Sequence, residues 1–178
     1  MNFQFPIFKQ SKGFTLIEIL IVLFIIAFLS AVLLIGRSSG EKKLALDRMA
    51  YQLSQDIREV QKMVMGAEEF DCGEGVLTYS FGLYFEDDWI DRYVIFADCN
   101  SNQERDSADS DIRQFELEEG INISALSPSS PLDIVFGPPD PMVYINGENW
   151  GQDAQISISF DSSIKNVKLN SAGRVERE

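Results

Sequence analysis

A single carboxylate, that of Glu18, lies inside a long apolar segment near the start of the chain. Residues 14–35 form a run of 22 residues in which only Thr15, Glu18 and Ser30 are polar. A carboxylate at such a position costs a few kcal/mol unless a cation neutralises it, so it is by default a functional residue. The chemistry that it indicates is charge pairing with an amine. The simpler alternative is an acid near a helix N-terminus, favoured by the helix dipole and reaching toward the headgroups.

A second group of oxygen donors lies between positions 98 and 111. The candidate calcium ligands are Asp98, Asn100, Asn102, Asp106 and Asp109. The first three stand at alternate positions, as in a calcium-binding loop. Gln103 occupies the position that normally requires glycine, and Asp109 replaces the long bidentate glutamate. The alternative is a solvated acidic loop between two strands, and we expect no cofactor other than this candidate calcium ion.

The two cysteines, Cys72 and Cys99, are the other reactive pair. In an oxidising compartment they can form a disulfide, whereas in the cytosol two reduced thiols are expected. For a loop of this size the chain-entropy treatment assigns the bridge about 3–4 kcal/mol of stabilisation. Two buried free thiols remain the alternative.

The composition argues against enzymatic and nucleic-acid functions. The chain has no histidine that could activate a serine or cysteine, and it has neither a phosphate-binding glycine loop nor a nucleophile elbow. We therefore predict that it is not an enzyme. Fifteen bases stand against 28 acids, which gives a formal net charge of −13. Such a surface repels phosphate backbones, so nucleic-acid binding is not expected.

The apolar run itself predicts a helix that anchors the chain in a membrane. At about 1.5 Å per residue the run would extend about 33 Å, enough to cross a bilayer core of about 30 Å. Lys9 and Lys12 precede it, which places the first 13 residues in the cytoplasm and the bulk of the chain outside it. Ordinary secretory signals differ, because their apolar core is shorter and the cleavage site follows it.

The sequence from Gly13 to Glu18, Gly-Phe-Thr-Leu-Ile-Glu, preceded by Lys12 and followed by the apolar run, resembles the class III signal of type IV prepilins and pseudopilins. The resemblance implies that a prepilin peptidase cuts between Gly13 and Phe14 and then N-methylates Phe14. It implies assembly with other pilins or pseudopilins through the N-terminal helix, on an inner-membrane assembly platform. Within the filament, Glu18 of one subunit can neutralise the new amine of a neighbour.

The remaining chain predicts a second helical half and a β-rich domain. The apolar stripe Leu46, Met49, Leu53, Ile57, Val60 and Val64 has helical spacing, and Gly66 is a natural stop. The predicted strands are Val76–Phe85, Arg92–Ala97, Ile112–Leu117, Ile121–Leu126 (returning beside the preceding strand), Leu132–Phe136, Met142–Ile145, Ile156–Phe160, Ile164–Leu169 and Gly173–Glu176. We therefore predict an α+β fold in which a long N-terminal helix packs on a small antiparallel β-sandwich.

The predicted organisation is a leader at 1–13, a transmembrane or filament-core helix at 14–36, its amphipathic continuation at 37–66, and an extracytoplasmic β-rich domain at 67–178. The order of motifs in this last part is similar to H-type minor pseudopilins and to T- and U-type minor pilins. These are the strand that ends in Ile95-Phe96-Ala97-Asp98, the Asn/Asp-rich loop, Pro138-Pro139-Asp140, and the closing strands that lead to Asn170–Val175. The function that this implies is a structural subunit of a type II secretion pseudopilus or a type IV pilus. The alternative is a filament-displayed subunit that binds DNA or cargo, although Glu176 and Glu178 offset the arginines of its C-terminal tail.

Overall fold

The computed structural model describes residues 13–35, 37–138, 142–149 and 151–178, and the chain divides into two compact units, Met1–Gly40 and Glu41–Glu178. Within the first unit the principal element is the helix α1, Leu16–Ile35. Its described side chains are almost all apolar and none of them is buried. The part of the predicted leader before Gly13 lies outside the described residues.

A second helix, α2 (Arg37–Met65), supplies one side of the core of the globular unit. All six residues of the predicted apolar stripe are buried, with exposed fractions of 4% or less. The predicted amphipathic pattern is therefore confirmed. Burial of such a stripe, rather than helix propensity, accounts for most of the stability of a helix in a folded protein.

The helix α2 ends where the sequence predicts, directly before Gly66, but its left-handed closing residue lies one position later. The helix ends at Met65, and the residue with positive φ is Ala67 (φ 48°) rather than Gly66. The Ala67 N–H donates to the Val64 carbonyl at 3.0 Å, and the Glu68 N–H donates to the Met63 carbonyl at 3.0 Å. This is a Schellman arrangement, in which the left-handed position normally favours glycine. Alanine at that position carries a steric cost.

Eleven strands follow α2 in the described part of the chain. They are β1 (Phe70–Asp71), β2 (Leu77–Thr78), β3 (Phe81–Phe85), β4 (Arg92–Ala97), β5 (Ser110–Glu116), β6 (Ile121–Ser127), β7 (Leu132–Gly137), β8 (Met142–Ile145), β9 (Ala154–Phe160), β10 (Ser163–Leu169) and β11 (Val175–Arg177). Antiparallel pairing builds a five-stranded sheet in the order β5-β4-β3-β7-β8, a four-stranded sheet in the order β11-β10-β9-β6, and the small pair β1-β2. The predicted α+β fold with antiparallel sheets is confirmed.

Two of the predicted strand assignments are wrong. Val76–Phe85 is not one strand but two, β2 and β3. The chain between 121 and 127 does not return beside β5. It pairs with β9 in the other sheet, with Ile121 opposite Phe160. Gly120 (φ 85°) makes this change of sheet possible, because it combines a left-handed backbone with close packing against the Phe160 ring.

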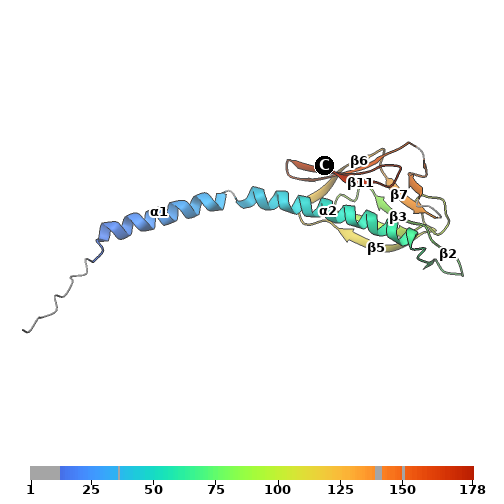
Figure 1. Cartoon of the computed structure of the whole chain (residues 1–178), viewed down its shortest axis with the longest axis horizontal. Helices are drawn as coiled ribbons and strands as arrows, with labels where there is room; N and C mark the ends of the chain where they lie inside the picture. The colour runs from blue at the N-terminus through green and yellow to red at the C-terminus, as the bar shows by residue number, and fades with distance from the viewer. Residues whose placement is uncertain (1–12, 36, 139–141, 150) are drawn as a thin grey trace, which may run out of the picture. The chain divides into compact units, whose positions relative to one another are not determined.

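Both large sheets contribute to one core with α2 (Figure 1). The helix stripe packs in one cluster with Phe81, Leu83 and Phe85 of β3 and with Ile156 and Ile158 of β9. A smaller cluster that contains Tyr84, Val94, Phe96 and Val135 is formed by the alternate residues of the five-stranded sheet. The strands β3, β4 and β7 are therefore almost wholly buried, and the loops at their ends have firm anchors.

Candidate functional site

The backbone before α1 is not helical at Gly13, Phe14 and Thr15. Thr15 is the N-cap of the helix. The Glu18 N–H donates to the Thr15 carbonyl at 3.1 Å and to its hydroxyl oxygen at 3.3 Å. A threonine cap satisfies one of the four N–H groups that a helix leaves without internal partners. The start of the helix is therefore fixed by the same short motif that contains Glu18.

Glu18 lies at the third position of α1, where an acid interacts favourably with the positive end of the helix dipole. The pattern Thr15-x-x-Glu18 is that of a capping box. Thr15 is the residue at this site that sequence reasoning missed, and the spacing of a threonine three residues before a glutamate could have revealed it.

The peptide bond between Gly13 and Phe14 is accessible. A Cβ added to Gly13 would meet no atom within 4 Å, and the side chain of Phe14 is 77% exposed. Exposed, non-helical backbone is the preferred substrate of proteases. The bond that the sequence predicts to be cut thus lies in the short non-helical segment just before the N-cap.

The surface of α1 is apolar on every side. Leu16, Ile17, Leu20, Leu23 and Phe24 are each more than half exposed. The hydroxyl of Ser30, which interrupts the run, donates to the Ile26 carbonyl at 2.7 Å and so presents no unpaired donor. A helix that is apolar all round is one that is buried in a larger assembly or a membrane. Within the part of the chain that the structure describes, no helix combines the length and hydropathy needed to cross a membrane.

Residues 8–34 match the family model of the prokaryotic N-terminal methylation motif. The chain carries a class III signal. This signal is consistent with a type IV pilin-like protein, and it indicates a precursor whose N-terminus is membrane-anchored. No curated protein and no solved structure matches the chain.

The class III signal contains all three N-terminal residues that the sequence predicts to be functional. Gly13, Phe14 and Glu18 all lie within the matched segment. A class III signal implies processing by a prepilin peptidase and assembly with other pilins. It also points to a structural protein rather than an enzyme. The individual roles of these three residues stay predictions.

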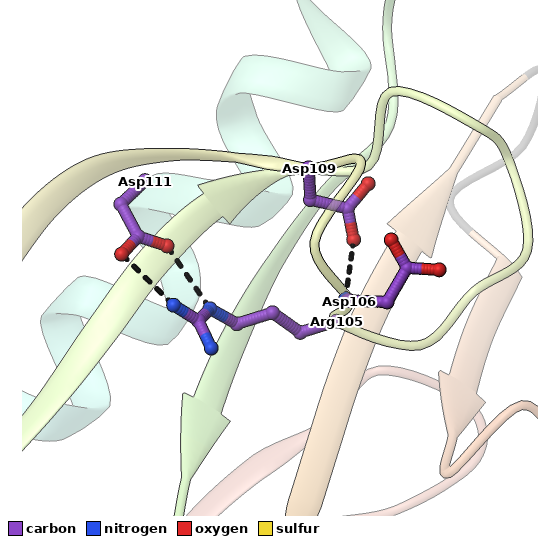
Figure 2. A network of polar contacts seen from close by, with 4 residues as sticks. All are labelled: Arg105, Asp106, Asp109 and Asp111. Carbon is purple, nitrogen blue, oxygen red and sulfur yellow. Dashed lines mark hydrogen bonds and ion pairs between the residues drawn. The ribbon is translucent and has the colours of Figure 1, made fainter.

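The second candidate site is the loop between β4 and β5, in which the five predicted calcium ligands do lie close together. Their oxygens, however, accept hydrogen bonds from the loop itself. Asp98 accepts from the N–H groups of Asn102 (3.2 Å) and Gln103 (3.1 Å). Asp109 accepts from the N–H groups of Cys99 (2.8 Å) and Asp106 (2.9 Å), the latter shown in Figure 2.

Asp106 completes this internal network. One of its oxygens accepts from the side-chain amides of Asn100 (2.9 Å) and Asn102 (2.8 Å), so both amides direct a donor, not an acceptor, at it. The other accepts from the Ala108 N–H at 2.7 Å, and these bonds lower the pKa of Asp106. Within the described residues, no group of three or more His, Cys, Asp or Glu side chains is arranged to hold a metal ion. Calcium binding by this loop stays a prediction.

Arg105 joins the loop to the five-stranded sheet. Its guanidinium binds both carboxylate oxygens of Asp111, at 3.0 and 2.9 Å (Figure 2), and lies 4.8 Å from the Tyr84 ring. The backbone N–H of Arg105 donates to the carboxylate of Asp133 at 2.9 Å. Burial raises the pKa of Asp133 to about 6, against the effect of the Arg105 N–H, which lowers it.

The structure contains the Cys72–Cys99 disulfide that the sequence predicts, with the two Cα atoms 5.8 Å apart. It connects the β1–β2 pair to the first residues of the loop after β4. The acidic loop thus has covalent and ionic anchors at its two ends.

One buried polar pair was also missed by sequence reasoning. Tyr93 of β4 donates its hydroxyl to the carboxylate of Asp56, which α2 places on its core side. Burial raises the pKa of Asp56, and the Tyr93 hydroxyl partly offsets that rise. The acid at position 56 lies between the buried Leu53 and Val60 on the helical stripe, and that position could have revealed it.

Proposed function

We propose that the chain is the precursor of a minor pilin or pseudopilin, a structural subunit of a type II secretion pseudopilus or a type IV pilus. The observation that carries the proposal is the class III signal at the start of a helix in which all residues except Glu18 and Ser30 are apolar. A β-rich domain with its own core follows, as a displayed or packed filament subunit requires. The motif order between 95 and 175 supports a minor subunit of the H, T or U type.

The proposed processing cuts between Gly13 and Phe14 and methylates the amine of Phe14. The cut leaves Thr15 in place, so α1 keeps its cap in the mature chain. The new N-terminus then lies one residue before that cap, with Glu18 one turn into the helix. In a filament, the carboxylate of Glu18 would neutralise the Phe14 amine of a neighbouring copy. Such a pair forms only at one stagger between subunits, so it would also set their register.

The proposed location is the cytoplasmic membrane, with the leader inside and the globular unit outside. Lys9 and Lys12 favour this orientation. The Cys72–Cys99 disulfide supports it, because disulfides persist in oxidising compartments. Before assembly, the apolar segment from Phe14 to Ile35 would hold the subunit in the membrane.

The DNA-binding alternative gains no support from the C-terminal strands. Arg174 pairs with Glu176 at 2.8 Å, and Lys168 pairs with Glu178 at 2.7 Å. Arg177 stacks over the Tyr51 ring at 4.9 Å. The tail therefore does not present the free row of cations that a phosphate backbone requires.

The decisive experiment is mass spectrometry of the protein isolated from its native envelope. We expect a chain that begins at N-methylated Phe14, and a chain that begins at Met1 when prepilin peptidase is deleted. The variant Glu18→Ala should be cleaved normally but should fall at least tenfold in the sheared filament fraction, and Ser30→Ala, another polar residue of α1, is the matched control. An intact Met1 terminus in wild-type cells refutes the proposal.

A further inference from the structure

The face of α2 that points away from the core is basic and partly apolar, in a unit that is otherwise strongly acidic. We define this outward face by Leu44, Arg48, Tyr51, Arg58, Lys62 and Met65, which follow one another at intervals of three, four or seven residues. All six are exposed, with Leu44 at 59%, Tyr51 at 52% and Met65 at 70%. Helical intervals of this kind place side chains on one side of a helix. They form a stripe opposite to the buried one.

The six residues of the outward face include no acid, and exposed Asp47, which borders them at helical spacing from Leu44 and Tyr51, is paired with Lys165 at 3.1 Å. The intervening position on the same side, 55, is a glutamine, whereas residues 41–178 hold 27 acids and 12 bases. Arg48 pairs with Glu118 at 3.3 Å, but within the described residues the structure records no ion pair for Arg58 or Lys62. Arginine, tyrosine and methionine are enriched at protein interfaces, and the outward face exposes all three residue types beside Leu44.

A surface hollow beside this face adds to its positive charge. It is lined by Asp47, Ala50, Arg58, Lys165, Val175 and Arg177. Lys165 is neutralised by Asp47 at 3.1 Å, and Arg177 lies over the Tyr51 ring at 4.9 Å. Arg58 and Arg177 therefore supply positive charge to the hollow, next to the apolar ring of Tyr51.

A complementary surface exists on the same chain, in the turn between β3 and β4. Residues 86–91 read Glu-Asp-Asp-Trp-Ile-Asp, and Ile90 is 50% exposed. The turn is rigid. The Leu117 N–H donates to the Asp91 carbonyl at 2.8 Å, the Ile123 N–H donates to the Ile90 carbonyl at 2.6 Å, and the Asp87 N–H donates to the Ser130 hydroxyl at 3.0 Å.

We propose that the outward face of α2 binds the β3–β4 turn of a second copy of this chain. Within one chain, α2 turns its buried stripe toward β3 and β4, so its outward face points away from these two strands. Two different surfaces that fit one another produce head-to-tail association, and an arrangement of this type that does not close extends as a helical filament. The inference rests on the proposed function and specifies the contact between globular units.

The test uses the full-length chain in cells that process it. In the variant Arg58→Glu/Lys62→Glu, the amount of the chain in the sheared filament fraction should fall at least fivefold. The added changes Asp87→Lys/Asp88→Lys should restore that amount. Lys168→Glu is the matched control. Lys168 lies on the outer side of β10, away from the outward face of α2, so this variant should assemble normally. Zero-length carbodiimide cross-linking of wild-type envelopes should join Lys62 to a carboxylate of the turn of another copy.

Normal assembly of Arg58→Glu/Lys62→Glu would overturn the contact. If the charge reversal in the turn does not repair the loss of assembly, a second copy of the chain is not what binds the outward face. That result would point to another acidic protein or to anionic lipid. Each variant is first checked for a methylated Phe14 terminus and for an unchanged melting temperature. Failure of processing in the wild-type chain would refute the proposed function instead, whereas the cross-link would still report on the contact.

Discussion

Replacement of Tyr93 by phenylalanine tests the buried pair that links α2 to the five-stranded sheet. The substitution keeps the ring that stacks between Phe85 and Phe115, at centroid distances of 5.3 and 5.2 Å, and removes only the hydroxyl. That hydroxyl donates to the carboxylate of Asp56. A buried carboxylate that loses a hydrogen-bond donor costs about 1–3 kcal/mol. We therefore expect Tyr93→Phe to lower the free energy of unfolding by about 2 kcal/mol at pH 7.

The loss should depend on pH in a defined direction. Burial already raises the pKa of Asp56 above its ordinary value, and the Tyr93 hydroxyl lowers it. A carboxyl whose pKa is higher in the folded state binds its proton more readily there, so stability falls as pH rises through the folded pKa. Removal of the hydroxyl raises that pKa further. The defect of Tyr93→Phe should therefore be largest at neutral pH and should shrink as the pH approaches 4.

The assay is urea unfolding of the fragment that begins at Glu41, at pH 4.5 and pH 7.5, with the disulfide intact. Tyr79→Phe is the matched control, since Tyr79 donates to Glu69 at 2.7 Å on the protein surface. Exposed pairs of this kind contribute little, so the control should change the free energy of unfolding by less than about 0.5 kcal/mol. Equal losses in the two variants, or a Tyr93→Phe loss that does not vary with pH, would refute the reasoning.

Further changes test other elements of the globular unit by the same unfolding assay. Asp133→Asn should flatten the decline in stability between about pH 4 and pH 7, by about 1–3 kcal/mol, because the folded pKa of Asp133 is about 6 and its protonated form is favoured below that pH; a decline as steep as that of the wild type would contradict this. Ala67→Gly should stabilise by about 1 kcal/mol, because it relieves a left-handed alanine, whereas the control Gly66→Ala should not. Cys72→Ser/Cys99→Ser should destabilise by about 2–4 kcal/mol, and an unchanged urea midpoint would count against this. For the acidic loop, we expect equal melting temperatures in calcium and in chelator, because its oxygens already accept internal hydrogen bonds, and a calcium-dependent rise lost in Asp98→Ala would establish an ion site.

The parts of the fold that depend on local pattern could be predicted from the sequence. Arg92–Ala97 and Met142–Ile145 have the predicted bounds, because each is a short apolar run flanked by turn residues. The buried stripe of α2 follows directly from helical spacing. The disulfide could be proposed because only two cysteines exist, but its support came from the expected compartment rather than from any geometry in the sequence.

The pairing of strands could not be predicted in the same way. The hairpin expected between 112 and 126 has good local signals, including Gly120, yet β6 pairs with the distant strand β9, from Ile121 opposite Phe160 to Ser127 opposite Gln155. A glycine with positive φ serves equally well in a tight hairpin and in a crossing from one sheet to another. The choice is made by burial. As residues of the four-stranded sheet, Ile121 and Ile123 are buried and share a core with Ile156 and Ile158.

In the candidate site, too, only the part that depends on local sequence could be predicted. The class III signal is a local code, so its residues are recognised from sequence without any knowledge of the β-rich domain. What the motif does not contain is the surface through which neighbouring globular units would meet in the proposed filament. That surface depends on α2 turning one stripe inward, which leaves the outward face exposed with its cations.

Glu18 and the outward face would then have separate tasks in a filament. The carboxylate would fix the stagger of apolar helices, and the cations would fix which surfaces of the globular units meet. Because the first pair lies in an apolar environment and the second is exposed to solvent, salt should weaken contacts between globular units well before it affects the helix core.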